Sequence, residues 1–275
     1  DFISMTSEFY CFLRLLGASV FLKVFPLIIL ILLKCEATLR ILGGRDALKD
    51  EFPFVVRLEA QIIEDHDKNI VHYYQICSGA AVTSKWVLTA AHCYLDHLSM
   101  FARYDSYFPS HMGKISPILK VHVHPQYTNQ RILINQNDVA LFLSQNILVS
   151  QYGKISAVDY KTLVGHKVII LGFGATNATP TEKPLQVLEG MMNNCLEIEK
   201  DFVEFPATMM CVVPLCGLEA TICGGDSGGP VVHSSGIVGV NSMSVDNCNE
   251  FTTNFKTTPG KTIINDTFLT NDFDI

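Results

Sequence analysis

Short extended runs follow one another along most of this chain. Each run is three to six residues long, is rich in β-branched and aromatic side chains, and is bounded by Gly, Pro, Asn or Ser. The clearest runs are Phe54–Leu58, Cys77–Val82, Trp86–Leu88, Val139–Leu143, Val168–Leu171 and Gly236–Val240. After residue 37, no segment has the apolar repeat of a long amphipathic helix. We therefore expect an all-β fold, built as a sandwich or a barrel.

The chain has 275 residues, which is enough for one large β unit or two small ones, and turn-like residues near 150–160 mark an expected boundary. Apolar residues make up 48% and charged residues 17%, so the chain can fill a core. The net charge is −7 and Lys and Arg do not cluster, so the sequence favours no nucleic-acid partner. Nine cysteines indicate an oxidising compartment.

The N-terminal segment differs in composition from the rest of the chain. Val24–Leu33 is an apolar run preceded by Lys23, and small residues follow it at Cys35 and Ala37, which is typical of a signal peptide. We expect residues 1–37 to be removed, with Met5 as a candidate initiator, and the mature protein to be secreted and extracellular. A retained signal anchor is the alternative, because Phe12–Leu33 is mostly apolar. No membrane partner is expected unless this anchor is retained.

Three segments contain the residue types that acyl transfer by a serine requires. A serine hydroxyl needs a base to take its proton, a carboxylate to orient that base, and donors for the developing oxyanion. The segment TAAHC contains His92, NDVAL contains Asp138, and GGDSGGP contains Ser227. We predict Ser227 as nucleophile, His92 as general base and Asp138 as the group that orients the histidine.

Glycines flank Ser227 on both sides, and glycine adopts backbone conformations that other residues avoid. Such a turn can aim two N–H groups into one concavity. We predict that the N–H groups of Gly225 and Ser227 form the oxyanion hole.

Together these segments resemble the chymotrypsin/trypsin family of serine endopeptidases, from Ile41 to about Cys248. They occur in the family's order of His, Asp and Ser, with separations of 46 and 89 residues. The resemblance implies two six-stranded antiparallel β-barrels with the active site in the cleft between them. The barrels would comprise residues of about 41–150 and 151–275. It also implies polypeptide substrates, protein inhibitors and no cofactor.

The segment that begins at Arg40 resembles the family's activation site. The resemblance implies that a trypsin-like protease cleaves after Arg40 and removes a propeptide of residues 38–40. The new α-amine of Ile41 would then pair with Asp226, because a buried carboxylate is costly without a partner. An ordinary basic residue before a strand is the alternative.

The resemblance also implies a disulfide pattern for the cysteines after the signal peptide. The pairs are Cys77–Cys93, Cys195–Cys211 and Cys223–Cys248. Cys216 is left over, as a free thiol or an intermolecular link. We expect no metal site. Cys216 has no second ligand at zinc-like spacing, and His122 and His124, which share a strand face, fit an ordinary passage from strand to loop at Pro125.

By resemblance, the base of the substrate pocket is Thr221 and one wall is formed by Ser242, Met243 and Ser244. Thr221 is neutral, so a substrate Arg or Lys would be buried unpaired, and we expect an apolar, chymotrypsin-like or elastase-like preference. The stretch Thr257–Ile275 is polar and departs from the family pattern. A non-catalytic, protease-like binding protein with a defective C-terminal region is therefore the alternative function.

Overall fold

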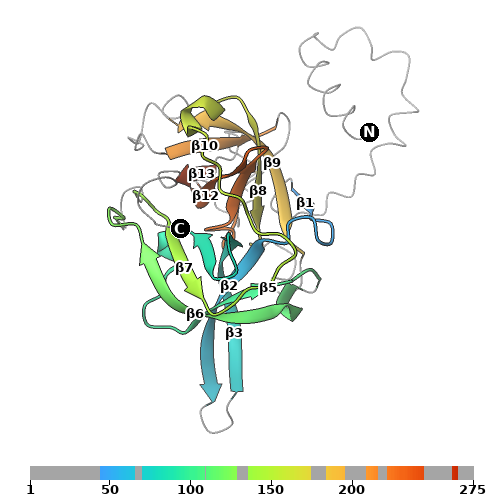
Figure 1. Ribbon diagram of the computed structural model, residues 1–275, viewed down its shortest axis with the longest axis vertical. Coiled ribbons are helices and arrows are strands. Elements are labelled where there is room, and N and C mark those ends of the chain that lie inside the picture. Colours follow the sequence, from blue (N-terminus) through green and yellow to red (C-terminus); the bar gives the residue numbers. More distant parts are fainter. Residues whose placement is uncertain are drawn as a thin grey trace, which may run out of the picture.

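In the computed structural model, the described residues are 44–65, 70–108, 110–128, 136–174, 184–195, 209–215, 222–244 and 262–265. Over these ranges the structure is nearly all β, with thirteen strands and three 3-10 helices. The helices are η1 (Ala91–Cys93), η2 (Ser110–Met112) and η3 (Tyr160–Leu163). Figure 1 shows the strands in two bodies, with β8 to β13 in the upper one and β2 to β7 in the lower one. The all-β prediction is confirmed.

Six antiparallel strands close into the first barrel, in the order β2-β3-β4-β7-β6-β5. They are β2 (Val55–Asp65), β3 (Ile70–Ala81), β4 (Trp86–Thr89), β5 (Met100–Tyr104), β6 (Lys114–Val123) and β7 (Ala140–Ser144). Side chains alternate along each strand, and the inward ones fill the interior. Leu58, Val87 and Phe142 are completely buried there. Burial of these side chains holds together strands that are distant in sequence.

Six further strands close into a second ring. They are β8 (Lys167–Gly172), β9 (Gln186–Asn194), β10 (Met209–Pro214), β11 (Pro230–His233), β12 (Gly236–Ser244) and β13 (Thr262–Asn265). The order is β9-β10-β13-β12-β11-β8, and β8 also pairs with β9, which closes the ring. Ile170, Leu188 and Val231 are buried inside it. The predicted pair of six-stranded barrels is therefore present.

The first strand belongs to the second barrel, although the division drawn from the sequence assigns residues 41–150 to the first. β1 (Arg45–Asp46) pairs with the outer edge of β9, with Asp46 opposite Gln186. Gln186 Nε2 donates to Asp46 Oδ1 at 2.8 Å, and the N–H of Ala47 donates to the carbonyl of Leu185 at 2.7 Å. The second barrel thus holds the beginning of the described chain.

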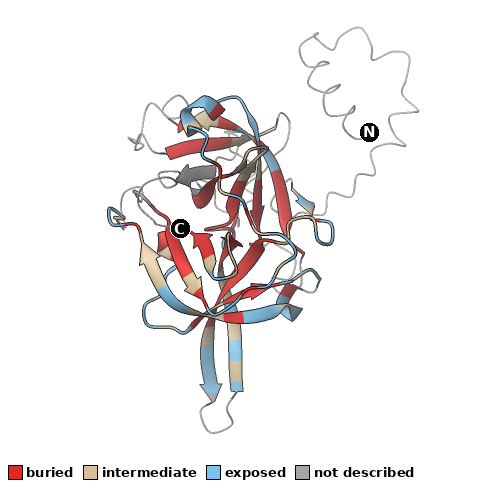
Figure 2. Ribbon diagram, in the orientation of Figure 1, coloured by how far each residue is buried: buried red, intermediate tan, exposed pale blue. Residues whose placement is uncertain are grey.

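A shared apolar cluster joins the two barrels. Leu88 and Leu141 from the first barrel pack with Leu171, Val187 and Ile237 from the second. Figure 2 shows buried strands where the two bodies meet. Burying one such side chain contributes about 1.5–3 kcal/mol, so this cluster fixes the position of one barrel on the other. The strands and turns that carry the predicted site residues are thereby held at fixed positions relative to one another.

Strands β2 and β3 continue beyond the barrel as a two-stranded arm (Figure 1). Their register pairs Gln61 with Tyr73 and Ile63 with Val71, whereas the pairing of β2 with β5 ends at Ala60. The sequence predicted only the inner halves of these strands, at 54–58 and 77–82. Apolar side chains of the arm such as Ile62, Ile63 and Ile70 are exposed, so the outer halves lack the clean apolar–polar alternation of a half-buried strand.

Candidate active site

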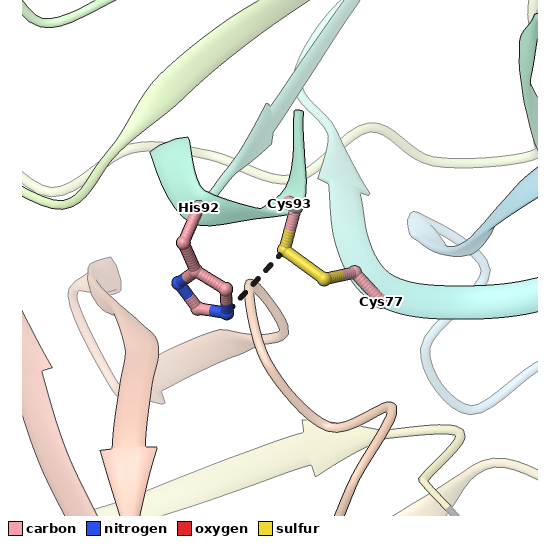
Figure 3. Close-up of side chains that lie close together, drawn as sticks. All are labelled: Cys77, His92 and Cys93. Atoms are coloured by element: carbon pink, nitrogen blue, oxygen red, sulfur yellow. Dashed lines mark hydrogen bonds between the residues drawn. A yellow bond between two sulfur atoms is a disulfide. The ribbon is translucent and has the colours of Figure 1, made fainter. Parts of the chain in front are cut away.

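His92 lies in η1, directly after strand β4. Its neighbours Ala91 and Cys93 are buried, whereas 25% of the His92 side chain is exposed. Cys93 forms a disulfide with Cys77 of β3, which ties the turn to the barrel wall (Figure 3). The imidazole is therefore presented at the surface of the barrel by a short, cross-linked turn.

Asp138 precedes strand β7 and is completely buried. Asn137 has a φ of 51°, a left-handed conformation that asparagine tolerates better than most residues. The N–H of Val139 donates to the carbonyl of Asn137 at 2.9 Å, which closes a tight turn. This turn directs the Asp138 carboxylate inward just before the buried strand begins.

Three hydrogen bonds converge on the Asp138 carboxylate. His92 Nδ1 lies 2.7 Å from Oδ2, and the His92 main-chain N–H donates to Oδ1 at 2.9 Å. The hydroxyl of Ser242 donates to Oδ2 at 2.5 Å. An ionised carboxylate only accepts hydrogen bonds, so the proton lies on Nδ1 and Nε2 carries a lone pair. The carboxylate thus fixes both the orientation and the tautomer of the ring.

The sequence assigned Ser242 to the substrate pocket, and its contact with Asp138 was missed. The pairing of β12 with β13 shifts between Asn241 and Met243, so Ser242 stands in a β-bulge. A bulge re-aims a side chain relative to the regular alternation of a strand. Only the three-dimensional pairing of β12 reveals this contact. Whether the main chain of residues 242–244 borders the substrate pocket stays a prediction.

Asp226 is completely buried beside the end of β8. Its Oδ1 accepts from the N–H of Gly174 at 2.7 Å, and its Oδ2 accepts from the N–H of Cys223 at 2.9 Å. Burial raises the pKa of Asp226 to about 6, against the opposing effect of these two N–H groups. Within the described ranges, no Lys, Arg or His forms an ion pair with this carboxylate. The carboxylate is hydrogen-bonded there but lacks a cation.

The turn that carries Ser227 lies against the first barrel. The Ser227 carbonyl accepts from the N–H of Ser78 at 2.8 Å. Gly228 has a φ of +73°, and a Cβ at this position would lie 2.0 Å from Thr89 Oγ1 and 2.9 Å from the nitrogen of Ala90. Only glycine allows this approach, which brings the turn against the chain that leads into His92.

Ser227 is partly exposed, and its hydroxyl makes no hydrogen bond to His92 among the residues that the structure describes. His92 Nε2 instead lies 3.9 Å from Cys93 Sγ (Figure 3). The structure thus joins His92 to Asp138 and brings the Ser227 turn against the same barrel. Catalytic hydrogen bonds are often formed only with substrate bound.

The amides of the turn divide into two groups. Those of Asp226, Gly228 and Gly229 donate to the carbonyls of Cys223, Asn241 and Asp226. Those of Gly224, Gly225 and Ser227 donate to no acceptor in the described part of the chain. This set includes the two amides predicted for the oxyanion hole, those of Gly225 and Ser227.

Cys77, His92 and Cys93 lie close enough together to resemble a metal site, with their ligand atoms within 4.8 Å of one another. Both sulfurs belong to one disulfide, however, and zinc requires thiolates. This group is therefore a cross-linked turn and not a set of ligands.

The structure contains the disulfides Cys77–Cys93 and Cys195–Cys211. Cys223 is disulfide-bonded as well, but its predicted partner Cys248 lies outside the described residues. So does Cys216.

Other predicted features also fall outside the described residues. They are the signal peptide, the propeptide, the activation residues Arg40 and Ile41, and the pocket residue Thr221. Met243 and Ser244 are described only as main chain of β12. Among the described residues, no helix has the length and apolar character needed to cross a bilayer.

Comparison with known proteins agrees with this geometry. The family model described as Trypsin matches residues 41–259. Human serine protease 1 is 26% identical over 215 residues, covering 76% of this chain and 80% of the relative. Trypsin of Xenopus laevis is 28% identical over 226 residues, covering 78% and 85%.

Among solved structures, mouse neuropsin, described as a serine protease expressed in the limbic system, superposes with a TM-score of 0.61. It is 23% identical, and the match covers 81% of this chain and 93% of neuropsin. At this identity the match supports the fold alone. The family match covers most of the chain and includes all three predicted catalytic segments. This chain therefore belongs to the trypsin family of serine endopeptidases.

Proposed function

We propose that this chain is a secreted serine endopeptidase in which Ser227 is the nucleophile, His92 the general base and Asp138 the orienting carboxylate. The observation that carries the proposal is the double hydrogen bond from His92 to the buried Asp138, with Ser242 as a further donor. This arrangement supports an Nε2 lone pair that can accept the proton of a serine hydroxyl.

In the acylation step, His92 Nε2 takes the proton of Ser227 Oγ as that oxygen attacks the carbonyl carbon of the scissile peptide bond. The carbonyl electron pair moves onto its oxygen, where the amides of Gly225 and Ser227 would bind it. The imidazolium, stabilised by Asp138, then gives its proton to the leaving amine as the C–N bond breaks. Water releases the acyl group by the same steps, and the proton returns to Ser227.

Activation by cleavage after Arg40 is supported by the reach of the chain. Asp46 of β1 lies opposite Gln186, which lies opposite Gly172 of β8. A Cβ on Gly172 would lie 2.2 Å from Asp226 Oδ1, so Asp226 is about two strand spacings, or about 10 Å, from Asp46. Asp46 is the fifth residue after Ile41, and five residue steps span up to about 17 Å. The chain between Ile41 and Asp46 is therefore long enough for a new amine on Ile41 to pair with Asp226.

We also propose an apolar preference at the primary pocket, because Thr221 offers no charge for a substrate Arg or Lys. The enzyme would then not cleave after its own Arg40, and a separate trypsin-like protease would activate it. Purified precursor that activates itself would contradict this preference.

Secretion is proposed from the N-terminal pattern of residues 1–37 together with the disulfides, which form and persist in oxidising compartments. Mass spectrometry of the N-terminus of the protein collected from culture medium tests this. A chain that stays in the membrane fraction with residues 1–37 intact would contradict it.

One experiment tests the catalytic proposal. The precursor is cut after Arg40 with trypsin, the trypsin is removed, and a fluorophosphonate probe is added, with Ser227→Ala as control. We expect labelling that is lost in the control and absent from the uncut precursor. A cut protein that is folded by circular dichroism but unlabelled would instead support the non-catalytic binding protein. The ring closure of the second barrel by β13 favours the enzyme.

A further inference from the structure

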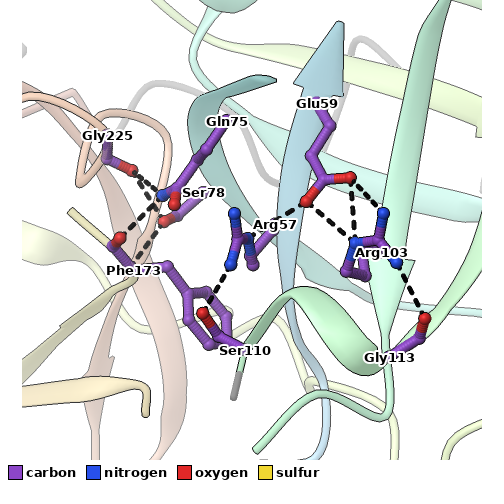
Figure 4. Close-up of polar contacts among 9 residues, drawn as sticks. All are labelled: Arg57, Glu59, Gln75, Ser78, Arg103, Ser110, Gly113, Phe173 and Gly225. Carbon is purple, nitrogen blue, oxygen red and sulfur yellow. Dashed lines mark hydrogen bonds and ion pairs between the residues drawn. The ribbon is translucent and has the colours of Figure 1, made fainter. Parts of the chain in front are cut away.

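Two side chains of β3 reach across to the turn that contains Gly225. Ser78 Oγ donates to the Gly225 carbonyl at 2.8 Å, and Gln75 Nε2 donates to the same oxygen at 3.4 Å (Figure 4). Both side chains also hold Phe173, which directly follows β8. The Phe173 N–H donates to Ser78 Oγ at 2.9 Å, and the Phe173 carbonyl accepts from Gln75 Nε2 at 2.8 Å. Four hydrogen bonds thus join three segments that are distant in sequence.

Ser78 contacts both residues whose amides are proposed to bind the oxyanion. Its side chain holds the carbonyl of Gly225, and its main-chain N–H donates to the carbonyl of Ser227 at 2.8 Å. Ser78 is completely buried, and its hydroxyl has a single proton, which Gly225 receives. This hydroxyl therefore donates to the turn and accepts from Phe173, and it links both to the first barrel.

Gly225 requires an external restraint to keep its amide in one direction. Its φ of +97° lies in a region that glycine enters freely and also leaves freely, because it has no side chain. Its N–H donates to no acceptor in the described part of the chain, so its carbonyl carries the hydrogen bonds that hold it there. That carbonyl belongs to the peptide unit between Gly225 and Asp226, so its hydrogen bonds hold the Gly225 Cα in place. They thereby restrict the φ and ψ rotations through which the Gly225 N–H could turn away.

We propose that Ser78 and Gln75 are positioning residues that hold the amide of Gly225 toward the oxyanion. This inference rests on the proposed catalytic function, and it concerns residues outside the triad and outside the oxyanion hole itself. A role in stability alone would change the unfolding temperature and leave the transition state unaffected. A positioning role lowers kcat and leaves KM nearly unchanged, because substrate binding does not need the oxyanion contact.

The test compares Ser78→Ala and Gln75→Ala with the wild type, each cut after Arg40, on a peptidyl-Phe p-nitroanilide. Removing an oxyanion donor lowers kcat by about 10²–10³, so loosening one should lower it by about 10–100-fold in Ser78→Ala, and less in Gln75→Ala. KM should change by less than about twofold.

A second readout is the affinity for a peptidyl trifluoromethyl ketone. Ser227 Oγ adds to the ketone carbon of this inhibitor, the serine proton passes to His92, and the ketone oxygen becomes an oxyanion. Its affinity should fall by the same factor as kcat/KM, while the affinity for the cleaved product peptide should not fall.

Ser144→Ala is the matched control, because Ser144 is a buried serine of the same barrel whose hydroxyl donates to the carbonyl of Lys85 at 3.1 Å. It should lose stability without losing kcat. An active wild type with unchanged kcat in Ser78→Ala would overturn this inference alone, whereas an unlabelled wild type would overturn the proposed function with it. Should Ser78→Ala not fold, an unchanged kcat in Gln75→Ala would overturn the inference.

Discussion

Replacing Asp226 by Asn should make the uncut protein increasingly more stable than the wild type as the pH rises from about 4 to about 7. Burial raises the pKa of Asp226 from 3.8 to about 6, so the folded state binds this proton more tightly than the unfolded state does. Between these values, raising the pH removes a proton that the folded state prefers to keep, and the free energy of unfolding falls. The loss is complete above the folded pKa and absent below the unfolded one.

The rise of the Asp226 pKa from 3.8 to about 6 corresponds to about 3 kcal/mol. The Asn variant has no proton to lose, so its stability relative to the wild type should increase by about this amount across the window. A fixed offset between the two proteins is expected at every pH, because an amide cannot accept from both Gly174 and Cys223 as the carboxylate does. Only the change with pH is informative.

Urea unfolding at pH 4, 5, 6 and 7, followed by far-UV circular dichroism, measures the difference in stability. A difference that stays constant within about 1 kcal/mol over this range would refute the reasoning. In the cut protein, pairing with the Ile41 amine should lower the pKa of Asp226, and the trend should disappear or reverse.

Three further substitutions test the site and its surroundings. Ser242→Ala removes a donor to the Asp138 carboxylate and should reduce stability by about 1.5–3 kcal/mol, as measured by urea unfolding, together with a lower kcat; unchanged values for both would contradict the assigned contact. Gly228→Ala places a methyl group 2.0 Å from Thr89 Oγ1 at a φ of +73° and should cost at least about 3 kcal/mol, so soluble yield should collapse; a well-folded variant would show that the turn can move. Tyr127→Phe removes a buried hydroxyl with no partner among the described residues, beside Asp138, and should be neutral or stabilising by up to about 1 kcal/mol in thermal unfolding; a clear loss of stability would reveal a hydrogen bond.

Short runs and turn residues were sufficient to predict the all-β class. The pair of barrels and the approach of His92 to Asp138 were expected from the resemblance of three segments to the chymotrypsin/trypsin family. The contact of Ser242 with Asp138 depends on a bulge in β12, and a bulge is set by pairing with another strand. No sequence pattern within residues 236–244 predicts this bulge.

Long-range contacts limited the prediction elsewhere as well. Ser78 and Gly225 are 147 residues apart, and nothing local to either indicates their hydrogen bond. Strand β13 lies within a stretch of mostly polar sequence. It forms because its backbone N–H and C=O groups pair with β10 on one side and with β12 on the other, which requires no amphipathic pattern. The division between barrels missed β1, since two residues are too short a run to carry a signal.

The pairing of β1 with β9 also bears on the kinetics of activation. A new chain end created five residues before this anchor would stay within about 17 Å of it, which gives it a local concentration on the order of 10–100 mM. Activation after the cut should therefore be first order and independent of protein concentration. A free dipeptide that mimics this end would have to be supplied at comparable concentrations to replace it in the uncut protein.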